Sequence, residues 1–538
     1  MLGKAAICQT IIIWDIGLDL SFIPEHHRVM ISGGEQHSAI FSSNKIAFGG
    51  SDYMYLGIDV GTSGVKALLI DDGGSVVAND TAPLDVLRPH AGWSEQNPED
   101  WWQAVNLAVQ NLQDRHPKQM AKVLGIGLSG QMHGMVALDA NDSVLRPAIL
   151  WNDTRNAAEA DALDSEFPAF RKIGGNAVMP GFTAPKAVWM QRHEPELFAK
   201  INKILLPKDF VRLQMTGEFC AEMSDGAGTL WMDVAQRCWS DKLLGACGLN
   251  SSQMPRLVEG SEISGTLRKD IATSWGIEGT PIVAGGAGDN AAAACGLGVT
   301  APGDAFLSLG TSGVVFAVTD SFSPAPENGA HAFCHAIPET WHQMGVILAA
   351  TDCLNWLAEI SGQTVSALMH DFEISDSGPS PVLFHPYLSG ERTPHNDAKA
   401  RGAFFGLSRA HDRREMTRAV IEGVAFALAD AVDVLAGANA RPSSLLATGG
   451  GAKSTQWLKI IAAVTQCPIM VPTGSDFGAA LGAARLGQAA AGNLEAGELR
   501  AIMQKPDRVE QIDSDKAITD AYGEAIMRWR KLYHAAKC

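Results

Sequence analysis

Short apolar runs on either side of a glycine-bearing turn open the patterned part of the chain, which begins at Met54. Residues 55–60 have the sequence Tyr-Leu-Gly-Ile-Asp-Val, residues 61–64 are Gly-Thr-Ser-Gly, and residues 65–70 are again mostly apolar. Two short apolar runs around such a turn are typical of a β-hairpin. The pattern therefore predicts strands at 55–60 and 65–70 joined by the turn.

A helix and a third strand are predicted after the hairpin. Residues 98–112 start with proline and place their large apolar side chains on one stripe, as expected of a packed helix. Residues 123–128 return to a strand pattern, and residues 517–536 have the spacing of a closing helix. Strands that alternate with helices indicate a mixed α/β sheet with helices packed against it.

Residues 1–53 lack this regularity. Their apolar run at 5–14 is interrupted by Gln9 and Thr10, and acidic residues follow it. A secretory signal peptide needs a basic start, an uninterrupted apolar stretch and a small-residue cleavage site. We therefore expect an N-terminal extension, poorly structured or from a mis-assigned start, that contributes little to the fold.

The hairpin has a second copy in the other half of the chain. Residues 305–314 have the sequence Ala-Phe-Leu-Ser-Leu-Gly-Thr-Ser-Gly-Val, again a strand, a Gly-Thr-Ser-Gly turn and a strand. Copies in two halves indicate two related α/β domains that face each other. We place these domains at 54–301 and 302–538.

Both turns have the chemistry of an anion site. Glycine lets successive backbone N–H groups point at one anion, and Thr and Ser hydroxyls add donors. One such turn is usually only a turn, whereas a matched pair favours a ligand. A third glycine element joins a strand to a helix within 445–461 and permits a flat or anionic ligand to approach closely. The candidate contacts are Gly61, Thr62, Ser63, Gly310, Thr311, Ser312, Gly449, Gly450 and Gly451.

Two aspartates stand next to these elements, and each has two interpretations. Asp289 follows the glycine-rich segment 280–288 and precedes a predicted helix, so it is either a helix cap or a carboxylate held ionised by the helix dipole and able to accept a proton. Asp59 ends the first strand, where it either bonds its own turn or helps to hold Mg²⁺ beside a phosphate. For Lys66, phosphate contact and solvated surface charge are equally favoured.

The composition and net charge limit the classes of partner that the protein is expected to bind. Lys and Arg number 42 against 59 Asp and Glu, and the resulting net charge of −17 argues against nucleic acid and anionic membranes. Backbone amides can still hold a phosphate in an acidic protein. The nine cysteines are scattered without a C-x-x-C pair, which indicates reduced thiols and a cytoplasmic location. The sequence contains no apolar run long enough to span a membrane.

Two further patterns suggest other functions. Residues 125–130 fit the glycine spacing of a dinucleotide site, but residues 131–134 are a poor helix start. His331 and His335 flank Cys334 at metal-ligand spacing; without a third ligand nearby, packed or hydrogen-bonded histidines are favoured.

Together the motifs resemble a known group of ATPases. Asp59-x-Gly-Thr-Ser-Gly, the second turn and Thr448-Gly-Gly-Gly are similar to the two phosphate hairpins and the adenosine loop of the actin/Hsp70/sugar-kinase ATPases. Within that group the chain resembles the FGGY family of carbohydrate kinases from Met54 nearly to its end. Residues 402–407 with 415–422 fit the C-terminal signature, and 181–186 fit the N-terminal one, with Ala187 in place of a larger apolar residue.

The resemblance implies a fold and an activity. The fold is α/β, with two actin/Hsp70-like (ribonuclease H-like) domains around a central cleft. The activity is ATP-dependent phosphorylation of D-xylulose, with Mg²⁺, in which Asp289 is the general base and Asp59 orients the metal. Met132, His133, Asp289 and Asn290 are the implied sugar contacts. The expected partner is a small-molecule sugar, with no nucleic acid and no membrane, and a homodimer is one candidate assembly.

Other functions stay open at this point. Ribulose, fuculose, gluconate or a polyol are competing substrates within the family. A nucleotide-driven chaperone or filament protein would share the phosphate hairpins, but no peptide-binding domain or polymer interface is evident in the C-terminal half. A nicotinamide oxidoreductase would depend on the glycines at 125–130 alone.

Overall fold

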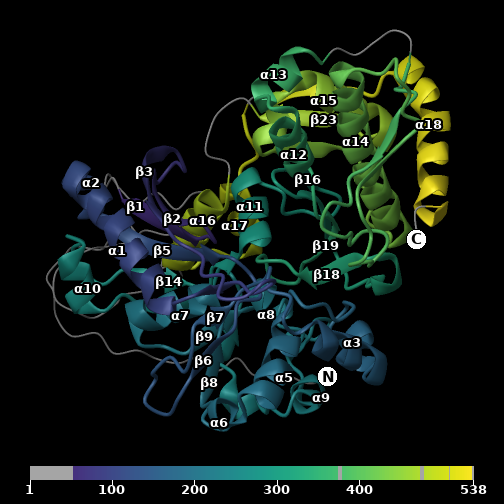
Figure 1. Cartoon of the computed structure of the whole chain (residues 1–538). Coiled ribbons are helices and arrows are strands. Elements are labelled where there is room, and N and C mark those ends of the chain that lie inside the picture. Colours follow the sequence, from purple (N-terminus) through teal and green to yellow (C-terminus); the bar gives the residue numbers. More distant parts are fainter. Residues whose placement is uncertain (1–52, 373–377, 473–477, 508, 536–538) are drawn as a thin grey trace, which may run out of the picture. The chain divides into compact units, whose positions relative to one another are not determined.

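The computed structural model describes residues 53–372, 378–472, 478–507 and 509–535 (Figure 1). The predicted N-terminal extension lies, up to residue 52, outside the described residues. Among the described helices, none is both long enough and apolar enough to cross a membrane.

The first predicted hairpin belongs to a seven-stranded mixed sheet. Its first strand runs antiparallel to the second, with Val60 opposite Val65, and parallel to the strand predicted at 123–128. Along the sheet the strands are β13 (Ile263–Thr266), β14 (Ile282–Ala284), β5 (Val123–Gly130), β1 (Met54–Val60), β2 (Gly64–Asp71) and β3 (Val76–Pro83), and β15 (Ala287–Gly288) pairs with β5.

The second hairpin belongs to another seven-stranded sheet built in the same way. Its first strand is antiparallel to the second and parallel to the strand before the triple glycine, so the internal repeat extends from sequence to pairing. The order is β18 (Ala330–Cys334), β19 (Trp341–Ile347), β17 (Gly313–Thr319), β16 (Ala305–Leu309), β22 (Leu445–Thr448), β23 (Ile469–Pro472) and β24 (Val509–Ile512).

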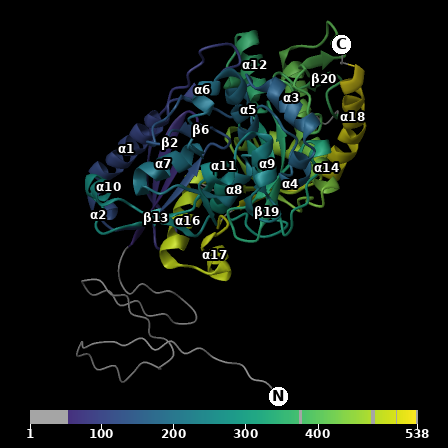
Figure 2. The ribbon, with the colours of Figure 1, turned by 90° about the horizontal axis from the view of Figure 1, so that it is seen from below.

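Helices cover both sheets. The predicted helix at 98–112 is α1 (Pro98–Arg115), whose N-cap Asn97 accepts the Glu99 backbone N–H at 3.5 Å. On the second sheet, α18 (Lys516–Ala535) lies beside α14 (Arg413–Gly437) in both views (Figures 1 and 2). The other long helices are α3 (Ala157–Glu166), α5 (Thr183–His193), α7 (Pro207–Thr216), α11 (Asp289–Leu297), α12 (Thr351–Ser361), α15 (Thr455–Thr465) and α16 (Ala479–Gly492).

Short elements complete the described chain. The short helices are α2 (Pro117–Met120), α4 (Ala169–Ile173), α6 (Pro195–Phe198), α8 (Met223–Ala227), α9 (Asp241–Ala246), α10 (Lys269–Ser274), α13 (Val365–His370), α17 (Ala496–Ile502) and the 3₁₀ turns η1 (Ser251–Gln253), η2 (Pro326–Asn328) and η3 (Gly450–Lys453). The short strands are β4 (Glu95–Gln96), β6 (Val136–Leu138), β7 (Ala148–Ile149), β8 (Lys203–Leu205), β9 (Cys220–Glu222), β10 (Met232–Asp233), β11 (Cys238–Trp239), β12 (Arg256–Val258), β20 (Leu383–His385) and β21 (Ala403–Phe405).

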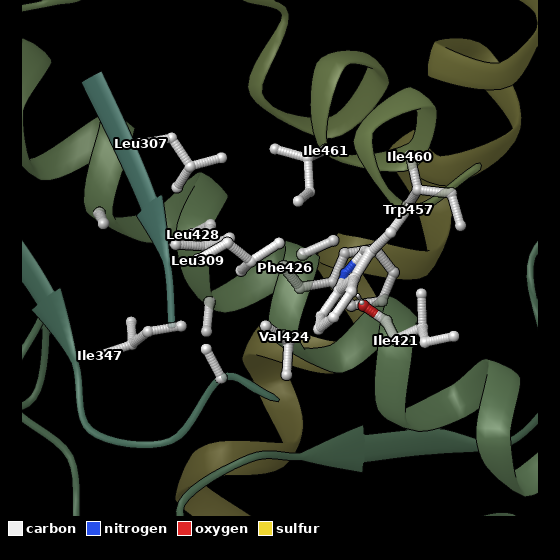
Figure 3. Close-up of a cluster of buried hydrophobic side chains, with 14 of the residues drawn as sticks. Leu307, Leu309, Ile347, Ile421, Val424, Phe426, Leu428, Trp457, Ile460 and Ile461 are labelled. Atoms are coloured by element: carbon white, nitrogen blue, oxygen red, sulfur yellow. Dashed lines mark hydrogen bonds between the residues drawn. The ribbon is translucent and has the colours of Figure 1, made fainter. Parts of the chain in front are cut away.

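The core of the second half lies between its sheet and helices α14 and α15. Figure 3 shows Leu309 of β16 among the side chains of these helices, with Trp457 of α15 next to α14. The Trp457 indole N–H donates to the backbone carbonyl of Ile421 at 3.1 Å, so this fully buried ring also satisfies its polar atom. This packing supports the second hairpin from behind.

Helix α16 follows β23 in sequence but packs on the first sheet. Its backbone comes so close that a Cβ on Gly57 would stand 1.9 Å from the Ala480 carbonyl oxygen, and one on Gly127 would stand 1.8 Å from that of Ala483. The glycines of the 125–130 segment therefore allow helix α16 to pack directly against their strand. They lie inside strand β5, so the dinucleotide turn they suggested in sequence is not formed.

Candidate active site

A pocket of about 170 Å³ contains residues from both halves of the chain. It is smaller than the pockets that hold drug-sized ligands, as expected of a site for a small polar molecule. Five predicted residues line it: Met132, His133, Asp289, Asn290 and Ser312. The sequence reasoning did not assign the remaining lining residues, which are Trp151, Phe182, Val314, His331, Phe333, Met344, Val346 and Arg392.

Asp289 is the first residue of α11, after the extended N-cap Gly288. Its Oδ1 accepts from the backbone N–H of Asn290 at 2.7 Å and from the Asn290 side-chain amide at 2.9 Å. Burial raises the pKa of Asp289 to about 6, and the negative charge of Asp59 raises it further. The two hydrogen bonds from Asn290 act in the opposite direction and lower this pKa. The N-cap of α11 is Gly288, so the interpretation of Asp289 as the helix cap is wrong, and its carboxyl group lines the pocket.

His133 presents a neutral imidazole to the same pocket. Burial lowers its pKa to about 3, and its Nδ1 lies 2.7 Å from the carbonyl oxygen of Gly228. Because a carbonyl can only accept, we assign the proton of the neutral ring to Nδ1. Nε2 is then left as an acceptor for a ligand hydroxyl.

The backbone at His133 is held in an unusual conformation, with φ at +70°. Its carbonyl oxygen accepts from the Thr183 hydroxyl at 3.1 Å and from the Lys186 ammonium at 2.7 Å. Both donors come from the first two turns of α5, within the segment that carries the N-terminal signature. That signature therefore positions the loop that carries the predicted sugar contacts Met132 and His133.

Two glycines make room for the side chain next to His133. A Cβ on Gly228 would stand 2.8 Å from Cε of Met132 and 2.9 Å from Nδ1 of His133. A Cβ on Gly288 would stand 3.0 Å from Cγ of Met132. The Met132–His133 pair is thus packed between the end of α8 and the start of α11.

A buried ion cluster fixes helix α8. Lys208 contacts Asp209 at 2.8 Å and Asp225 at 2.9 Å, and it lies 3.4 Å from Glu222, all fully buried. Glu222 caps α8 by accepting from two backbone N–H groups. The Ser224 hydroxyl donates to Glu222 at 3.1 Å and accepts from the Gly288 backbone N–H at 3.0 Å. Through these bonds α8 positions the residue immediately before Asp289.

The first hairpin turn is held by a side-chain network. The Thr62 hydroxyl donates to Gln131 Oε1 at 2.9 Å and accepts from the Trp151 indole N–H at 3.0 Å. Gln96 donates to the Thr62 carbonyl at 2.8 Å and accepts from Gln131 at 2.8 Å. The single hydroxyl proton of Thr62 is therefore already used. The Gly61 N–H donates to the Gly64 carbonyl at 3.0 Å, so the turn offers an anion the backbone N–H groups of Thr62 and Ser63 and the exposed Ser63 hydroxyl.

The second turn is anchored by helix α12. The Gly310 carbonyl accepts from the backbone N–H of Thr351 at 3.0 Å and from its hydroxyl at 2.8 Å, and the Thr311 carbonyl accepts from Ala350 at 2.7 Å. Thr311 is exposed, while Ser312 lines the pocket. Of the predicted phosphate contacts in the described chain, Ser312 is the one that lines this pocket.

Contrary to the sequence prediction, the triple glycine at 449–451 does not lead directly into a helix. Gly450 and Gly451 lie within the 3₁₀ turn η3, with Gly449 as its N-cap, and α15 begins only after Ser454, whose hydroxyl accepts from the Trp457 backbone N–H. A Cβ on Gly449 would stand 2.6 Å from the Leu309 carbonyl oxygen, and one on Gly451 would stand 2.5 Å from Leu309 Cγ. Gly450 is exposed, with no atom within 4 Å of an added Cβ. Two of the three glycines are therefore explained by packing on the second hairpin.

Asp59, near the end of strand β1, has a carboxylate that is not fully hydrogen-bonded. Its Oδ1 is buried without a hydrogen-bond partner in the described structure. Burial raises its pKa, while Ser129 and the positive charge of Lys66, opposite it on β2, lower that pKa. Such an orphaned carboxylate oxygen beside a predicted phosphate turn fits a Mg²⁺ ion or its bound water.

The two histidines considered as metal ligands are hydrogen-bonded within the fold. His331 Nδ1 lies 2.9 Å from Asn176 Oδ1, and His335 Nδ1 accepts from the Ile337 backbone N–H at 3.1 Å. Across the described ranges, no group of three or more His, Cys, Asp or Glu side chains is arranged to hold a metal. Magnesium needs no such cage, because it is commonly held by one or two carboxylates together with substrate phosphates.

Some of the missed residues had a signal in the sequence. Phe182 lies within the N-terminal signature at 181–186. His331 was recognised only as a metal candidate. Val314 and Met344 belong to apolar strands and had no signal, since nothing local distinguishes a pocket wall from a core position.

Comparisons with known proteins agree with this geometry. Models of the N-terminal and C-terminal domains of the FGGY family of carbohydrate kinases match residues 54–296 and 305–491. These matches, together with the mixed α/β sheets, confirm the predicted two-domain fold of the actin/Hsp70-like type. The exact boundaries placed at 301 and 302 stay a prediction.

Individual relatives cover nearly all of the patterned chain. The xylulose kinase of Escherichia coli (strain K12) is 53% identical over 481 residues, which is 89% of this chain and 98% of that protein. The crystal structure of a xyloylose kinase from Brucella ovis has a TM-score of 0.87 at 53% identity, covering 90% and 99% of the two chains. A gluconate kinase from Lactobacillus acidophilus has a TM-score of 0.82 at 25% identity, covering 90% and 99%.

Proposed function

This chain belongs to the FGGY family of carbohydrate kinases, and from that premise we propose that it phosphorylates D-xylulose at its terminal hydroxyl, producing D-xylulose 5-phosphate and ADP. The observation that carries the proposal is one pocket in which the carboxyl of Asp289, the neutral ring of His133 and the second phosphate turn meet. The choice of D-xylulose is supported by the activity named for relatives at 53% identity.

The sugar is bound and oriented by the loop at 132–133 and the start of α11. Nε2 of His133 accepts a hydrogen bond from one sugar hydroxyl, and the Asn290 amide is a further polar contact. Met132 and the aromatic ring of Phe182 cover the apolar edge of the carbon chain. A short ligand held at these points delivers its far hydroxyl to Asp289.

Asp289 then acts as the general base. The sugar hydroxyl oxygen attacks the γ-phosphorus of ATP, its proton passes to Asp289, and the bond between that phosphorus and the β,γ-bridging oxygen breaks to release ADP. A pKa of about 6 leaves most of the carboxyl ionised near pH 7 while keeping it basic enough to accept the proton. The two turns bind the phosphates through backbone N–H groups, with Ser63 and Ser312 as hydroxyl donors.

Asp59 is positioned to hold Mg²⁺ or its waters through its unpartnered Oδ1. The bound ion supplies neutralisation of the phosphate charge. Asp59 also raises the pKa of Asp289 through its own negative charge, so the two carboxylates are close enough to affect each other.

A coupled ADP-release assay over ketoses, polyols and aldonates tests the proposal. We expect D-xylulose to give the highest kcat/KM. Preferential turnover of gluconate would contradict the choice of substrate, a possibility that the likeness to a gluconate kinase makes concrete.

The Asp289→Asn variant tests the mechanism independently of the sugar. It keeps the size of the side chain and removes the basic oxygen pair, so transfer should fall by about 100- to 10,000-fold, the range typical of general bases. ATP binding measured by calorimetry should stay within a few-fold of wild type. Sugar phosphorylation close to the wild-type rate would remove the assignment of the base.

A further inference from the structure

The Arg392 side chain lies in the wall of the sugar pocket without a protein partner. It follows β20 in the loop at 386–397, and its backbone N–H donates to Glu391 Oε1 at 2.8 Å. Its guanidinium makes no hydrogen bond or ion pair with any residue that the structure describes. A cation that has lost part of its hydration and has no protein partner is costly to maintain. This arrangement points to a ligand oxygen as the missing partner.

The guanidinium lies beside the loop that leads into α5, within the pocket that also contains His133 and His331. A Cβ on Gly181 would stand 3.2 Å from Arg392 Nη2, which places this side chain from the second half against the loop before α5. The charge of Arg392 contributes to lowering the pKa of His133 and of His331. Asp289 is instead affected by Asp59. Phe182 follows Gly181 in the chain, and its ring packs against those of His133 and His331 with centroids 4.8 and 5.7 Å apart, so Arg392 belongs to the histidine end of the pocket.

His331 adds an acceptor at this end. The ring is 2% exposed, and its Nδ1 lies 2.9 Å from Asn176 Oδ1. The orientation of the Asn176 amide is fixed because its nitrogen donates to the Gly174 carbonyl at 3.0 Å and to the Ala332 carbonyl at 2.9 Å. His331 Nδ1 must then be the donor, and burial keeps the ring neutral by lowering its pKa well below the usual value. Its Nε2 is a buried acceptor that has no partner in the described chain.

We propose that Arg392 and His331 recognise the carbonyl end of the ketose and thereby set the preference for ketoses over polyols. The guanidinium donates to the C2 ketone oxygen, and His331 Nε2 accepts from the C1 hydroxyl. A ketone oxygen is only an acceptor, so a donor-only guanidinium matches it, whereas the hydroxyl of a polyol also brings a proton that needs an acceptor. This inference rests on the proposed function, since it names the part of D-xylulose that each group binds.

The first test uses the wild-type protein and sugar analogues. Compared with D-xylulose, 1-deoxy-D-xylulose lacks the C1 hydroxyl and xylitol lacks the ketone. Each should show a kcat/KM lower by about 10- to 100-fold, the loss expected when a buried or charged group is left without its hydrogen bond. Equal kcat/KM for all three would overturn the proposal without any variant. Turnover of D-xylulose itself tests the proposed function separately.

The second test assigns the contacts to residues. Arg392→Met should raise the KM for D-xylulose by about 10- to 100-fold, leave the KM for ATP within about twofold, and reduce the preference for D-xylulose over xylitol by a similar factor. Arg392→Lys, which keeps the charge, should recover part of the loss. His331→Phe keeps the size of the ring, and it should lower kcat/KM for D-xylulose by about tenfold relative to 1-deoxy-D-xylulose.

Two outcomes would reject these assignments. A fall in kcat that is equal for D-xylulose and xylitol, with an unchanged sugar KM, would place Arg392 on the transferred phosphoryl group. An unchanged discrimination between D-xylulose and 1-deoxy-D-xylulose in the His331 variant would exclude that histidine. The unfolding temperature of each variant, compared with wild type, identifies a variant that fails to fold, and in that event the analogue series on the wild-type protein decides.

Discussion

At the scale of single residues, burial sets the protonation of two neighbouring groups in opposite directions. It lowers the pKa of His133 to about 3, which keeps the imidazole neutral, and it raises the pKa of Asp289 to about 6. In the proposed mechanism the histidine therefore only orients the sugar at neutral pH, while the aspartate exchanges the proton. When the pKa values of two groups in one pocket are shifted in opposite directions, the two groups can have separate chemical roles.

The raised pKa of Asp289 predicts an acid limb in the pH profile. Because the base must be ionised, kcat/KM for the sugar should fall as the pH drops through about 6, tenfold for each further pH unit. The profile is measured from about pH 5 to 8.5 at saturating ATP, and the residual activity of Asp289→Asn should lack this limb. A limb near the ordinary carboxyl pKa of about 4 would show that burial does not control the base.

At the scale of elements, α8 links the two ends of the site. Its end supplies the Gly228 carbonyl that fixes the His133 ring, and its Ser224 hydroxyl accepts from the backbone N–H of Gly288. The fully buried Lys208 cluster holds this short helix through Glu222. A five-residue helix has little stability of its own, so the ion cluster supplies the rigidity that the site needs.

Local pattern was sufficient for some elements and failed for others. Both hairpins and α1 were predicted correctly because each carries its signal within a few residues. The role of Gly125 and Gly127 was ambiguous in the sequence, because these glycines are needed for the close packing of α16, which lies far along the chain. The resemblance identified His133, but no pattern could place Arg392 beside it, because that contact depends on how a loop of the second half meets the first.

The close approach of α16 to β5 can be tested by one added methyl group. Gly127→Ala should destabilise the protein by about 3 kcal/mol or more, because the Cβ would stand 1.8 Å from the Ala483 carbonyl oxygen and backbone cannot move aside cheaply. Urea unfolding measures the loss. Gly523→Ala in α18 is the matched control: its Cβ meets no atom within 4 Å, so it should stabilise by about 0.5–1 kcal/mol. Equal effects of the two changes would refute the packing role of Gly127.

At the scale of the whole molecule, the net charge of −17 contrasts with a polyanionic substrate. In the proposed function, the long-range repulsion of ATP is offset by local contacts at the binding site. The phosphate turns offer backbone N–H groups, and the unpartnered Asp59 oxygen suits a divalent cation. Activity should therefore depend on magnesium more than on any one lysine.

All identified parts of the enzyme lie downstream of residue 53. Both sheets, their cores and every residue that lines the pocket belong to the described chain, and the family match begins at residue 54. A protein that starts at Met54 should therefore retain the unfolding temperature and both KM values of the full chain, with kcat within about twofold, since it keeps every contact described above between residues of the site.

A deletion that continues through Asp71 is the matched control for this truncation. It removes β1 and β2, and with them Asp59 and the first phosphate turn, and it exposes the strand edge of β5 and the glycine face on which α16 packs. This longer deletion should abolish cooperative unfolding, because the centre of a seven-stranded sheet is lost. A large loss of stability or activity already in the shorter truncation would show instead that residues 1–53 are part of the working enzyme.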